Sequence, residues 1–222
     1  MNMSSKIETP ELLLMTSGNA VISKTAVATT NFDYRIMSRS SLQDGDVTLR
    51  TVVLEDIESI RQWRNSQLDV LRQAAPISPE AQERYFAEQI WPDKLLLQPK
   101  QVLLAIERKH ELIGYGGLVQ IAWHDRRAEV SFLLAPSIES SPLDRAIVFS
   151  SFLRLLQELA FKDLGLLRLW TETYAHRTAH LRTLEAAGFQ REGCLRSHVM
   201  INSEPIDSLL HGLLADEWKE QQ

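Results

Sequence analysis

The sequence predicts an α/β protein in which one mixed sheet of seven strands carries helices on both faces. Strand-like and helix-like periodicity alternate along residues 46–218, which is typical of mixed α/β folds. Helix-starting and helix-ending residues separate the segments, and short polar turns join neighbouring strands. No internal repeat and no shift in composition marks a second domain in this stretch.

The first half of the stretch is predicted to form a strand, two helices and two further strands. Apolar residues alternate in the strands and recur at helical spacing in the helices. Ser78 and Pro79 predict a helix start, because a hydroxyl caps the first turn and proline fits within it. Lys109–Glu111 predicts a hairpin turn. The expected elements are a strand at 47–52, helices at 54–63 and 79–90, and strands at 102–107 and 112–121.

The second half is predicted to add four strands and two helices. Ser141, Pro142 and Asp144 have the form of a capping box with proline just inside the helix. Gly165 and Gly188 are expected to end the two helices. The expected elements are a strand at 128–135, a helix at 142–161, a strand at 167–174, a helix at 177–187, and strands at 199–201 and 207–214 joined by a turn at 202–205.

Composition excludes several classes of protein. The chain of 222 residues has 24 Lys and Arg against 29 Asp and Glu, a net charge of −5, so it lacks the basic surface of a nucleic-acid binder. Its single cysteine, Cys194, excludes an intrachain disulfide and a cysteine-built zinc site. No apolar run approaches the roughly 20 residues of a membrane span. We therefore expect a cytoplasmic protein that contacts neither nucleic acid nor membrane.

Residues 1–45 differ from the rest of the chain. They are rich in Ser, Thr, Asn and Met and show no sustained periodicity. Leu12–Met15 is a short apolar patch, but the acidic Glu8 and Glu11 next to it argue against a secretory signal. We expect residues 1–45 to form a flexible arm, residues 46–218 the single domain, and residues 219–222 a tail.

The order of elements, together with four segments, resembles the GCN5-related N-acetyltransferase (GNAT) superfamily. The fourth segment is the most specific, since it contains Leu184-Glu185, Gly188-Phe189 and Glu192-Gly193. The ending of the first helix, Trp63-Arg64-Asn65, looks most like the branch that acetylates ribosomal-protein N-termini and nucleotide-linked amino sugars. The four segments are Val47–Arg50 with Asp56–Asn65, Leu112–Leu118, Ala128–Leu134 and Leu184–Gly193.

The resemblance implies an acetyl-CoA-dependent N-acetyltransferase on a mostly antiparallel sheet with two splayed central parallel strands. Those strands would be Ala128–Ala135 and Leu167–Tyr174, and the open edge would pair with the pantetheine amides of CoA as an added strand does. Holding two reactants at attack distance is worth about 7–11 kcal/mol, so positioning would supply much of the catalysis. Phe132, Leu133 and Leu134 on the open edge are expected to contact CoA.

Glu129 is our first choice of general base, acting directly or through water. An amine must lose a proton before it attacks the thioester, and strand alternation places Glu129 on one face with Ser131. The alternative from the residues alone is a surface carboxylate paired with Arg126 or Arg127.

The family's usual tyrosine acid cannot be carried over, because Leu184 occupies its position. Tyr174 and His180 are the expected proton donors to the thiolate. His176 and His180 are four residues apart, which would place them on one helical face, but no third metal ligand accompanies them. We expect no metal.

The family's pyrophosphate loop is glycine-rich, whereas residues 136–145 contain no glycine and two acids. One interpretation is a capped helix start and nothing more. The other is that small hydroxyl side chains replace glycine beside backbone N–H groups that bind phosphate, and that basic side chains supply charge. The expected CoA-binding residues here and at the next helix start are Ser137, Ser140, Ser141, Arg145, His176 and Arg177.

The acceptor side is expected to involve Arg64, Asn65, Arg72 and Trp123. The arginines can grip phosphate or carboxylate, or they can be solvated helix charges. The leading hypothesis is transfer to a primary amine of a small molecule, with a nucleotide-linked amino sugar as one candidate, by a monomer or homodimer. The alternatives are a protein N-terminal acetyltransferase and a catalytically inactive binding module with the same fold.

Overall fold

The structure is a computed structural model that describes residues 32–73 and 75–220, and it contains one eight-stranded sheet. The strand order is β1-β2-β3-β4-β5-β6-β8-β7. All neighbouring strands pair antiparallel except β5 and β6. The strands are β1 (Ser41–Asp44), β2 (Val47–Thr51), β3 (Val102–Arg108), β4 (Glu111–Ala122), β5 (Arg127–Leu134), β6 (Arg168–Tyr174), β7 (Gln190–Ile201) and β8 (Glu204–Leu214).

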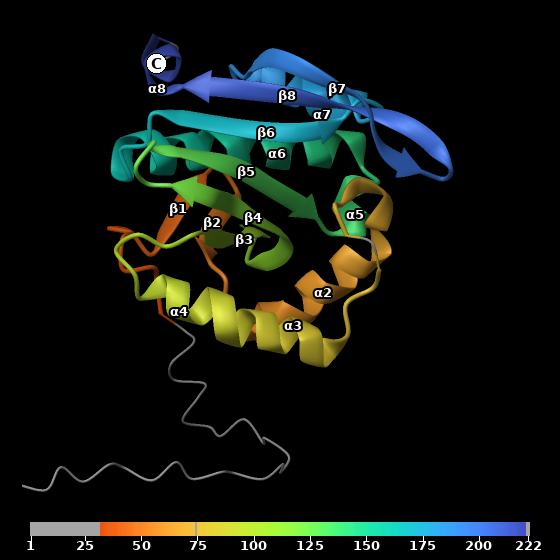
Figure 1. Cartoon of the computed structure of the whole chain (residues 1–222). Coiled ribbons are helices and arrows are strands. Elements are labelled where there is room, and N and C mark those ends of the chain that lie inside the picture. Colours follow the sequence, from red (N-terminus) through yellow and green to blue (C-terminus); the bar gives the residue numbers. More distant parts are fainter. Residues whose placement is uncertain (1–31, 74, 221–222) are drawn as a thin grey trace, which may run out of the picture.

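Helices cover both faces of the sheet, as expected (Figure 1). On one side α2, α3 and α4 follow one another across the strands, and α6 lies on the other side. The capping residues are those that the sequence indicated, because the side chains of Ser78 and Ser141 accept the backbone N–H groups of Ala81 and Asp144. The helices are α2 (Ile57–Ser66), α3 (Pro79–Tyr85), α4 (Trp91–Lys94), α5 (Pro136–Glu139), α6 (Pro142–Gln157), α7 (Thr178–Ala186) and α8 (Ala215–Glu220), with 3-10 turns at Leu54–Asp56 and Leu68–Val70 and π-helical turns at Phe86–Ile90 and Glu158–Asp163.

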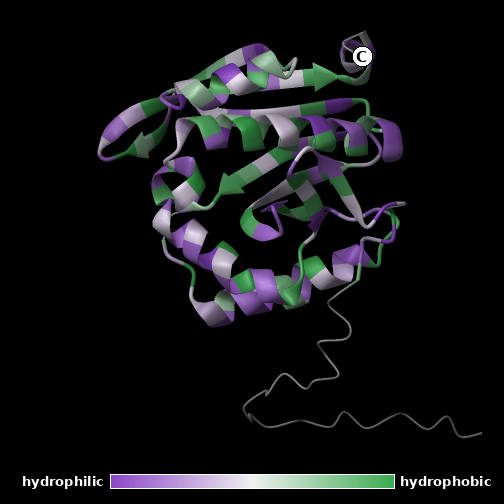
Figure 2. Cartoon of the chain, turned by 180° about the vertical axis from the view of Figure 1, so that it is seen from behind, coloured by the Kyte–Doolittle hydropathy of each residue, from purple (hydrophilic) through white to green (hydrophobic). Residues whose placement is uncertain are grey.

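Two hydrophobic cores lie on the two faces of the sheet. Alternation along β3 shows the division: Leu104 packs with Phe149 and Phe152 of α6, whereas Leu103 packs with Ile60 of α2. The helices carry hydrophilic and hydrophobic residues in turn, as elements with one buried face do (Figure 2). The sheet is therefore held between two layers, and residues of one strand can face either a core or a cleft.

The parallel strands β5 and β6 part after a short ladder, which confirms the expected splay. They pair only at three positions, from Arg127 opposite Arg168 to Glu129 opposite Trp170. β5 then continues with β4 alone as far as Leu134. Close approach of β4 and β5 depends on Gly116, since a Cβ there would lie 2.4 Å from the carbonyl oxygen of Ser131. The divergence leaves one backbone edge of β5 without a strand partner.

Three expectations about elements need correction. The sheet has an eighth strand, β1, which pairs with β2 and was not expected. β7 starts at Gln190 rather than Val199, because most of its side chains are exposed and give no apolar alternation. The segments 136–139 and 215–220, which were not assigned to helices, are helical.

Part of the expected N-terminal arm belongs to the folded domain. Tyr34 is 1% exposed and its hydroxyl accepts the backbone N–H of Leu103, and Leu42 in β1 is also buried. The domain therefore begins before residue 46. The rest of that arm, residues 1–31, lies outside the described residues.

Candidate functional site

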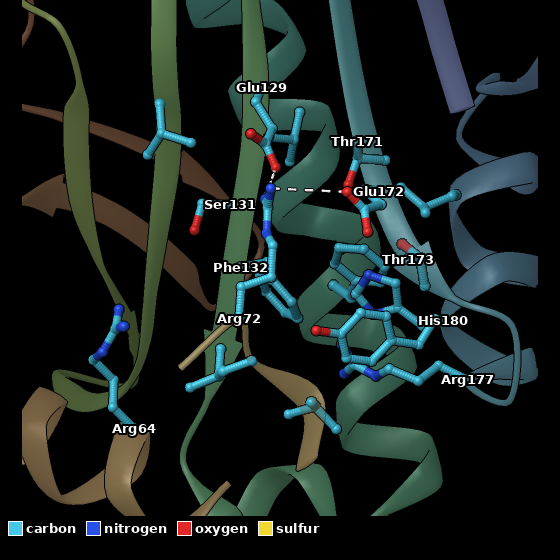
Figure 3. Close-up of a pocket in the computed structure, with 17 residues that line it drawn as sticks. Arg64, Arg72, Glu129, Ser131, Phe132, Thr171, Glu172, Thr173, Arg177 and His180 are labelled. Atoms are coloured by element: carbon cyan, nitrogen blue, oxygen red, sulfur yellow. Dashed lines mark hydrogen bonds and ion pairs between the residues drawn. The ribbon is translucent and has the colours of Figure 1, made fainter. Parts of the chain in front are cut away.

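A cavity of about 220 Å³ opens where β5 and β6 part (Figure 3). β5 contributes Ser131 and Phe132, and β6 contributes Glu172 and Tyr174. Phe132 stacks on Phe149 of α6, with ring centroids 4.3 Å apart, and this pair closes the α6 side. The cavity therefore lies at the divergence that an added strand or an extended ligand would fill.

Glu129 is buried beside this cavity, with only 2% of its surface exposed. Its Oε1 accepts a hydrogen bond from Arg72, and its Oε2 accepts one of 2.6 Å from the side-chain amide of Gln120. Gln120 has a positive φ of 49° at the irregularity between β4 and β5, a conformation that commonly aims a side chain at a functional site. The alternative of a surface carboxylate paired with Arg126 or Arg127 is wrong.

The environment makes Glu129 a stronger base than an ordinary glutamate. Burial raises its pKa above 4.5, the positive charge of Arg72 lowers it, and the nearby carboxylate of Glu172 raises it further. The pKa of Glu129 is raised overall, because burial and the negative charge of Glu172 outweigh the positive charge of Arg72. The assignment of Glu129 as general base stays a prediction.

Glu172 is a residue that the sequence analysis missed. It lies two residues before Tyr174 on β6, and its Oε2 is 3.8 Å from Nη1 of Arg72. Its Oε1 lies 3.5 Å from Nε2 of His198. The alternation of β6 could have indicated Glu172. Trp170 pairs with Glu129, and Glu172, two residues further along the strand, shares the face of Trp170.

Tyr174 and Leu184 both line the cavity. Leu184 is fully buried in the core beside α6 and has no proton to give. Tyr174 is 7% exposed, and burial together with Glu172 raises the pKa of its hydroxyl above 10. Tyr174 is therefore protonated at neutral pH, which is the state that a proton donor needs.

His180 lines the same cavity but is neutral. Its ring stacks on Phe149 with centroids 4.1 Å apart, and burial lowers its pKa well below 6.5, with Arg177 and Arg145 adding to the effect. His176 precedes α7, so the expectation that it shares a helical face with His180 is wrong. No group of three His, Cys, Asp or Glu side chains that could hold a metal ion occurs among the described residues.

A second cavity, of about 510 Å³, continues from the first. The two share Val70, Arg177 and His180 in their walls. Arg145 and Arg177 converge on one carboxylate, since Glu139 lies 3.6 Å from the first and 3.4 Å from the second. His176 also lines this cavity, so it and the two arginines lie together, and their role in CoA binding stays a prediction.

Two hydroxyls of the glycine-free loop, those of Ser140 and Ser141, are used within the chain. Ser141 Oγ accepts the backbone N–H of Asp144 and donates to its carboxylate at 2.7 Å, as a helix cap does. Ser140 donates to the carbonyl oxygen of Ser137, 3.0 Å away. Of these three serines only Ser140 lines the second cavity.

The open edge of β5 is partly engaged. The side-chain amide of Gln67 donates to the carbonyl oxygen of Leu134 at 2.9 Å. Leu133 and Leu134 bury their side chains in opposite cores, so only their backbone can face a ligand, whereas the ring of Phe132 lines the cavity.

The four residues expected on the acceptor side have different positions. Arg64 and Arg72 line the first cavity, and Figure 3 shows Arg64 well apart from the group around Arg72. Arg64 donates to the Tyr115 hydroxyl at 2.8 Å and to Gln73 at 2.9 Å.

The other two residues do not reach this cavity. Asn65 holds the backbone of Ile77 through two hydrogen bonds, so it orders the loop after α2. Trp123 donates to the carbonyl oxygen of Pro99 at 2.7 Å and packs on the core beside α6. The expectation that Trp123 lies on the acceptor side is not met, because its ring packs within the fold.

A third cavity, of about 330 Å³, borders the first on the side of α2 and α3. The two share Arg64, Val119 and Ser131. Its walls are largely apolar, with Phe86 and Tyr115 among them.

No helix in the described part of the chain is both long and apolar enough to cross a membrane.

Comparison with known families gives a match over most of the chain. The family model described as the acetyltransferase (GNAT) domain matches residues 49–210. The uncharacterized N-acetyltransferase p20 of Bacillus licheniformis is 24% identical over 173 residues, which cover 78% of this chain and 94% of that protein. The uncharacterized N-acetyltransferase YoaA of Bacillus subtilis is 27% identical over 122 residues, 54% of this chain and 66% of that protein.

Solved structures with the same fold include a spermidine N-acetyltransferase from Vibrio cholerae in complex with CoA and spermine. It superposes with a TM-score of 0.68 at 19% identity and covers 79% of this chain and 99% of that chain. A further structure, of the spermidine/spermine N-acetyltransferase SpeG from the same organism, has a TM-score of 0.67. These likenesses confirm the fold, while the branch suggested by Trp63-Arg64-Asn65 stays a prediction.

Proposed function

The chain belongs to the GNAT acetyltransferase family, and we propose that it transfers the acetyl group of acetyl-CoA to the primary amine of a small molecule. One observation supports this most directly. The buried carboxylate of Glu129 lies where β5 and β6 part, so a base stands at the entrance to a slot of the shape that an extended thioester needs. The relatives' N-acetyltransferase names agree with the reaction class.

The residues present fit CoA at two places. The unpaired edge of β5 offers backbone groups to the pantetheine amides, and Arg145 and Arg177 offer positive charge to the phosphates in the second cavity. Acetyl-CoA supplies the activated acyl group. Glu139 pre-orders both arginines, so they need little reorganisation when a phosphate arrives.

Two side chains would move the protons of the reaction. Glu129 accepts the proton of the incoming ammonium, directly or through one water, and leaves a neutral amine that forms the new C–N bond as the C–S bond breaks. Tyr174 donates its hydroxyl proton to the departing thiolate, and the nitrogen gives up its second proton to solvent as the amide forms, from which Tyr174 is reprotonated. His180 is a weaker candidate for this step, because its neutral ring is stacked on Phe149.

The acceptor's body would extend into the third cavity, across Ser131 and Val119. The largely apolar walls suit an amine with an apolar body. The site fits a nucleotide-linked amino sugar less well, because Arg64 and Arg72 both bind residues of the chain and so are not directed at a phosphate. Spermidine, the acceptor named for the structural relatives, and protein N-termini belong in the same test.

Thiol release from acetyl-CoA, measured against amino sugars, polyamines, arylalkylamines and N-terminal peptides, tests the proposal. Turnover with a small amine and none with peptides is the expected result. Turnover with peptides alone would replace this proposal with protein N-terminal acetylation. No thiol release with any amine would remove it.

A second candidate, a binding module without catalysis, is favoured by the loop at residues 136–145. The hydroxyls of Ser140 and Ser141 are engaged within the chain and Glu139 would lie beside the CoA phosphates. Calorimetric titration with acetyl-CoA distinguishes the two. The transferase requires binding at micromolar to millimolar ligand, and absence of heat at millimolar ligand favours the non-catalytic module.

A further inference from the structure

The site proposed for the acceptor already contains a cation, the guanidinium of Arg72. Figure 3 shows Arg72 lying between β5 and β6, with contacts to Glu129 on one side and Glu172 on the other. Arg72 comes from the segment that follows the 3-10 turn Leu68–Val70, so it reaches the strands from outside the sheet. Its side chain is 52% exposed, whereas those of the two carboxylates are 3% and 9% exposed.

The two glutamates need a cation between them. Placing two carboxylates in a poorly solvated cavity is costly unless a positive charge compensates them. Glu172 is more than nine-tenths buried and lines the cavity, and its Oε1 makes no hydrogen bond to any described residue. One guanidinium thus serves two carboxylates, and beyond it the second has His198 Nε2 3.5 Å from its Oε1 without a hydrogen bond between them.

Both oxygens of Glu129 are occupied while Arg72 is in place. Arg72 donates to Oε1 and Gln120 donates to Oε2. Each oxygen keeps a second lone pair, but the guanidinium of Arg72 occupies a position where an ammonium would pair with the carboxylate, and its charge favours the ionised form of Glu129. A cationic acceptor therefore competes with Arg72 for the same place beside Glu129, and the half-exposed side chain of Arg72 gives it a route into solvent.

We propose that the acceptor enters as a cation and takes the place of the Arg72 guanidinium between Glu129 and Glu172, so that Glu172 selects cationic amines over neutral ones. This rests on the proposed transferase function. Exchange of one cation for another keeps the charge of the site constant, so both carboxylates stay paired throughout.

The test uses n-butylguanidinium, which mimics the Arg72 head, and its neutral isostere n-butylurea. Calorimetry on the full chain measures binding without any need for turnover. In the unsubstituted protein the cation should bind roughly tenfold or more tighter than the urea. Arg72→Gln should bind the cation roughly tenfold tighter still, because the internal competitor is gone.

Two further variants complete the design. Glu172→Gln, in the Arg72→Gln background, should lose roughly tenfold or more in affinity for n-butylguanidinium. Arg154→Gln is the matched control, since Arg154 is likewise an exposed arginine paired with a carboxylate, Asp44, but lies outside all three cavities. It should bind as the unsubstituted protein does.

Equal binding of the cation and the urea to the unsubstituted protein would overturn the inference, even if Arg72→Gln failed to fold. Unchanged or weaker binding in a folded Arg72→Gln protein would overturn it too. Failure of the transferase proposal is seen separately, as absence of thiol release. Cation binding that follows the expected pattern without thiol release keeps the cation site and removes the transferase.

Discussion

Glu129 of β5 lies opposite Trp170 of β6 in the last residue pair that the two parallel strands share. Beyond this pair the strands separate and the first cavity begins. The end of the ladder thus places a buried carboxylate at the mouth of the slot.

Glu129→Gln should lower kcat by about 10²–10⁴-fold, the usual contribution of a general base. In the unsubstituted protein, kcat/KM should fall as the pH falls through the pKa of Glu129, which burial raises above 4.5. The variant should lack this acidic limb. Steady-state rates between pH 5 and pH 9, with Glu58→Gln on the exposed face of α2 as control, check both statements. If the pH profile of Glu129→Gln ran parallel to that of the unsubstituted protein, Glu129 would not be the general base.

Tyr174→Phe should lower kcat by about a hundredfold and leave the dissociation constant of acetyl-CoA unchanged. The reason is that the hydroxyl, which burial keeps protonated, donates to the thiolate only as the C–S bond breaks. Rates are compared with binding measured by titration. If kcat is unaltered, the proton comes from another group, and His180→Gln becomes the next variant to test.

Arg145→Gln should weaken acetyl-CoA binding by about tenfold, since it removes a charged donor from the second cavity. Glu139→Gln should have the opposite sign and tighten binding, because its negative charge lies beside the same phosphates. Titration at two salt concentrations measures both effects, and salt should shrink them. Glu158→Gln, on the outer surface with Arg39, is the control. Weaker binding in Glu139→Gln would instead show that its ordering of the arginines dominates.

Lys94 should give the protein a pH-dependent stability. Its ammonium is fully buried, donates to the carbonyl oxygens of Phe32 and Val52 at 2.9 and 2.6 Å, and lies 4.9 Å from the ring centre of Trp91. Burial lowers its pKa from 10.5 to about 8. Between these values the unfolded chain binds more protons than the folded one, so the free energy of unfolding rises with pH.

Urea unfolding of the unsubstituted protein and Lys94→Met at several pH values between 7 and 10 measures this. The unsubstituted protein should gain about 2 kcal/mol relative to the variant over that range. Lys219→Met, in which an exposed lysine is replaced, should show no such gain. A constant difference between the unsubstituted protein and Lys94→Met would contradict the assigned pKa.

The sequence alone predicted much of the fold because local patterns encode it. Alternation located the buried strands, and Ser78 and Ser141 marked helix starts that the structure confirms. The strands that it missed or shortened lack this pattern. β1 has four residues with one buried side chain, and most of β7 faces solvent.

The sequence by itself determined most of the elements, the family and the face of β5 that carries Glu129, since each follows from periodicity or from motifs along one segment. Only the tertiary structure decided that Arg72 lies between Glu129 and Glu172, that Trp123 packs into the fold, and that Arg145 and Arg177 share Glu139. Most of these contacts join segments tens of residues apart, and those of Arg72 form because two strands part and a loop reaches the gap. The spacing of residues along the chain does not indicate which distant segments come into contact. The charge pairing across the cavity can therefore be identified only in the folded sheet.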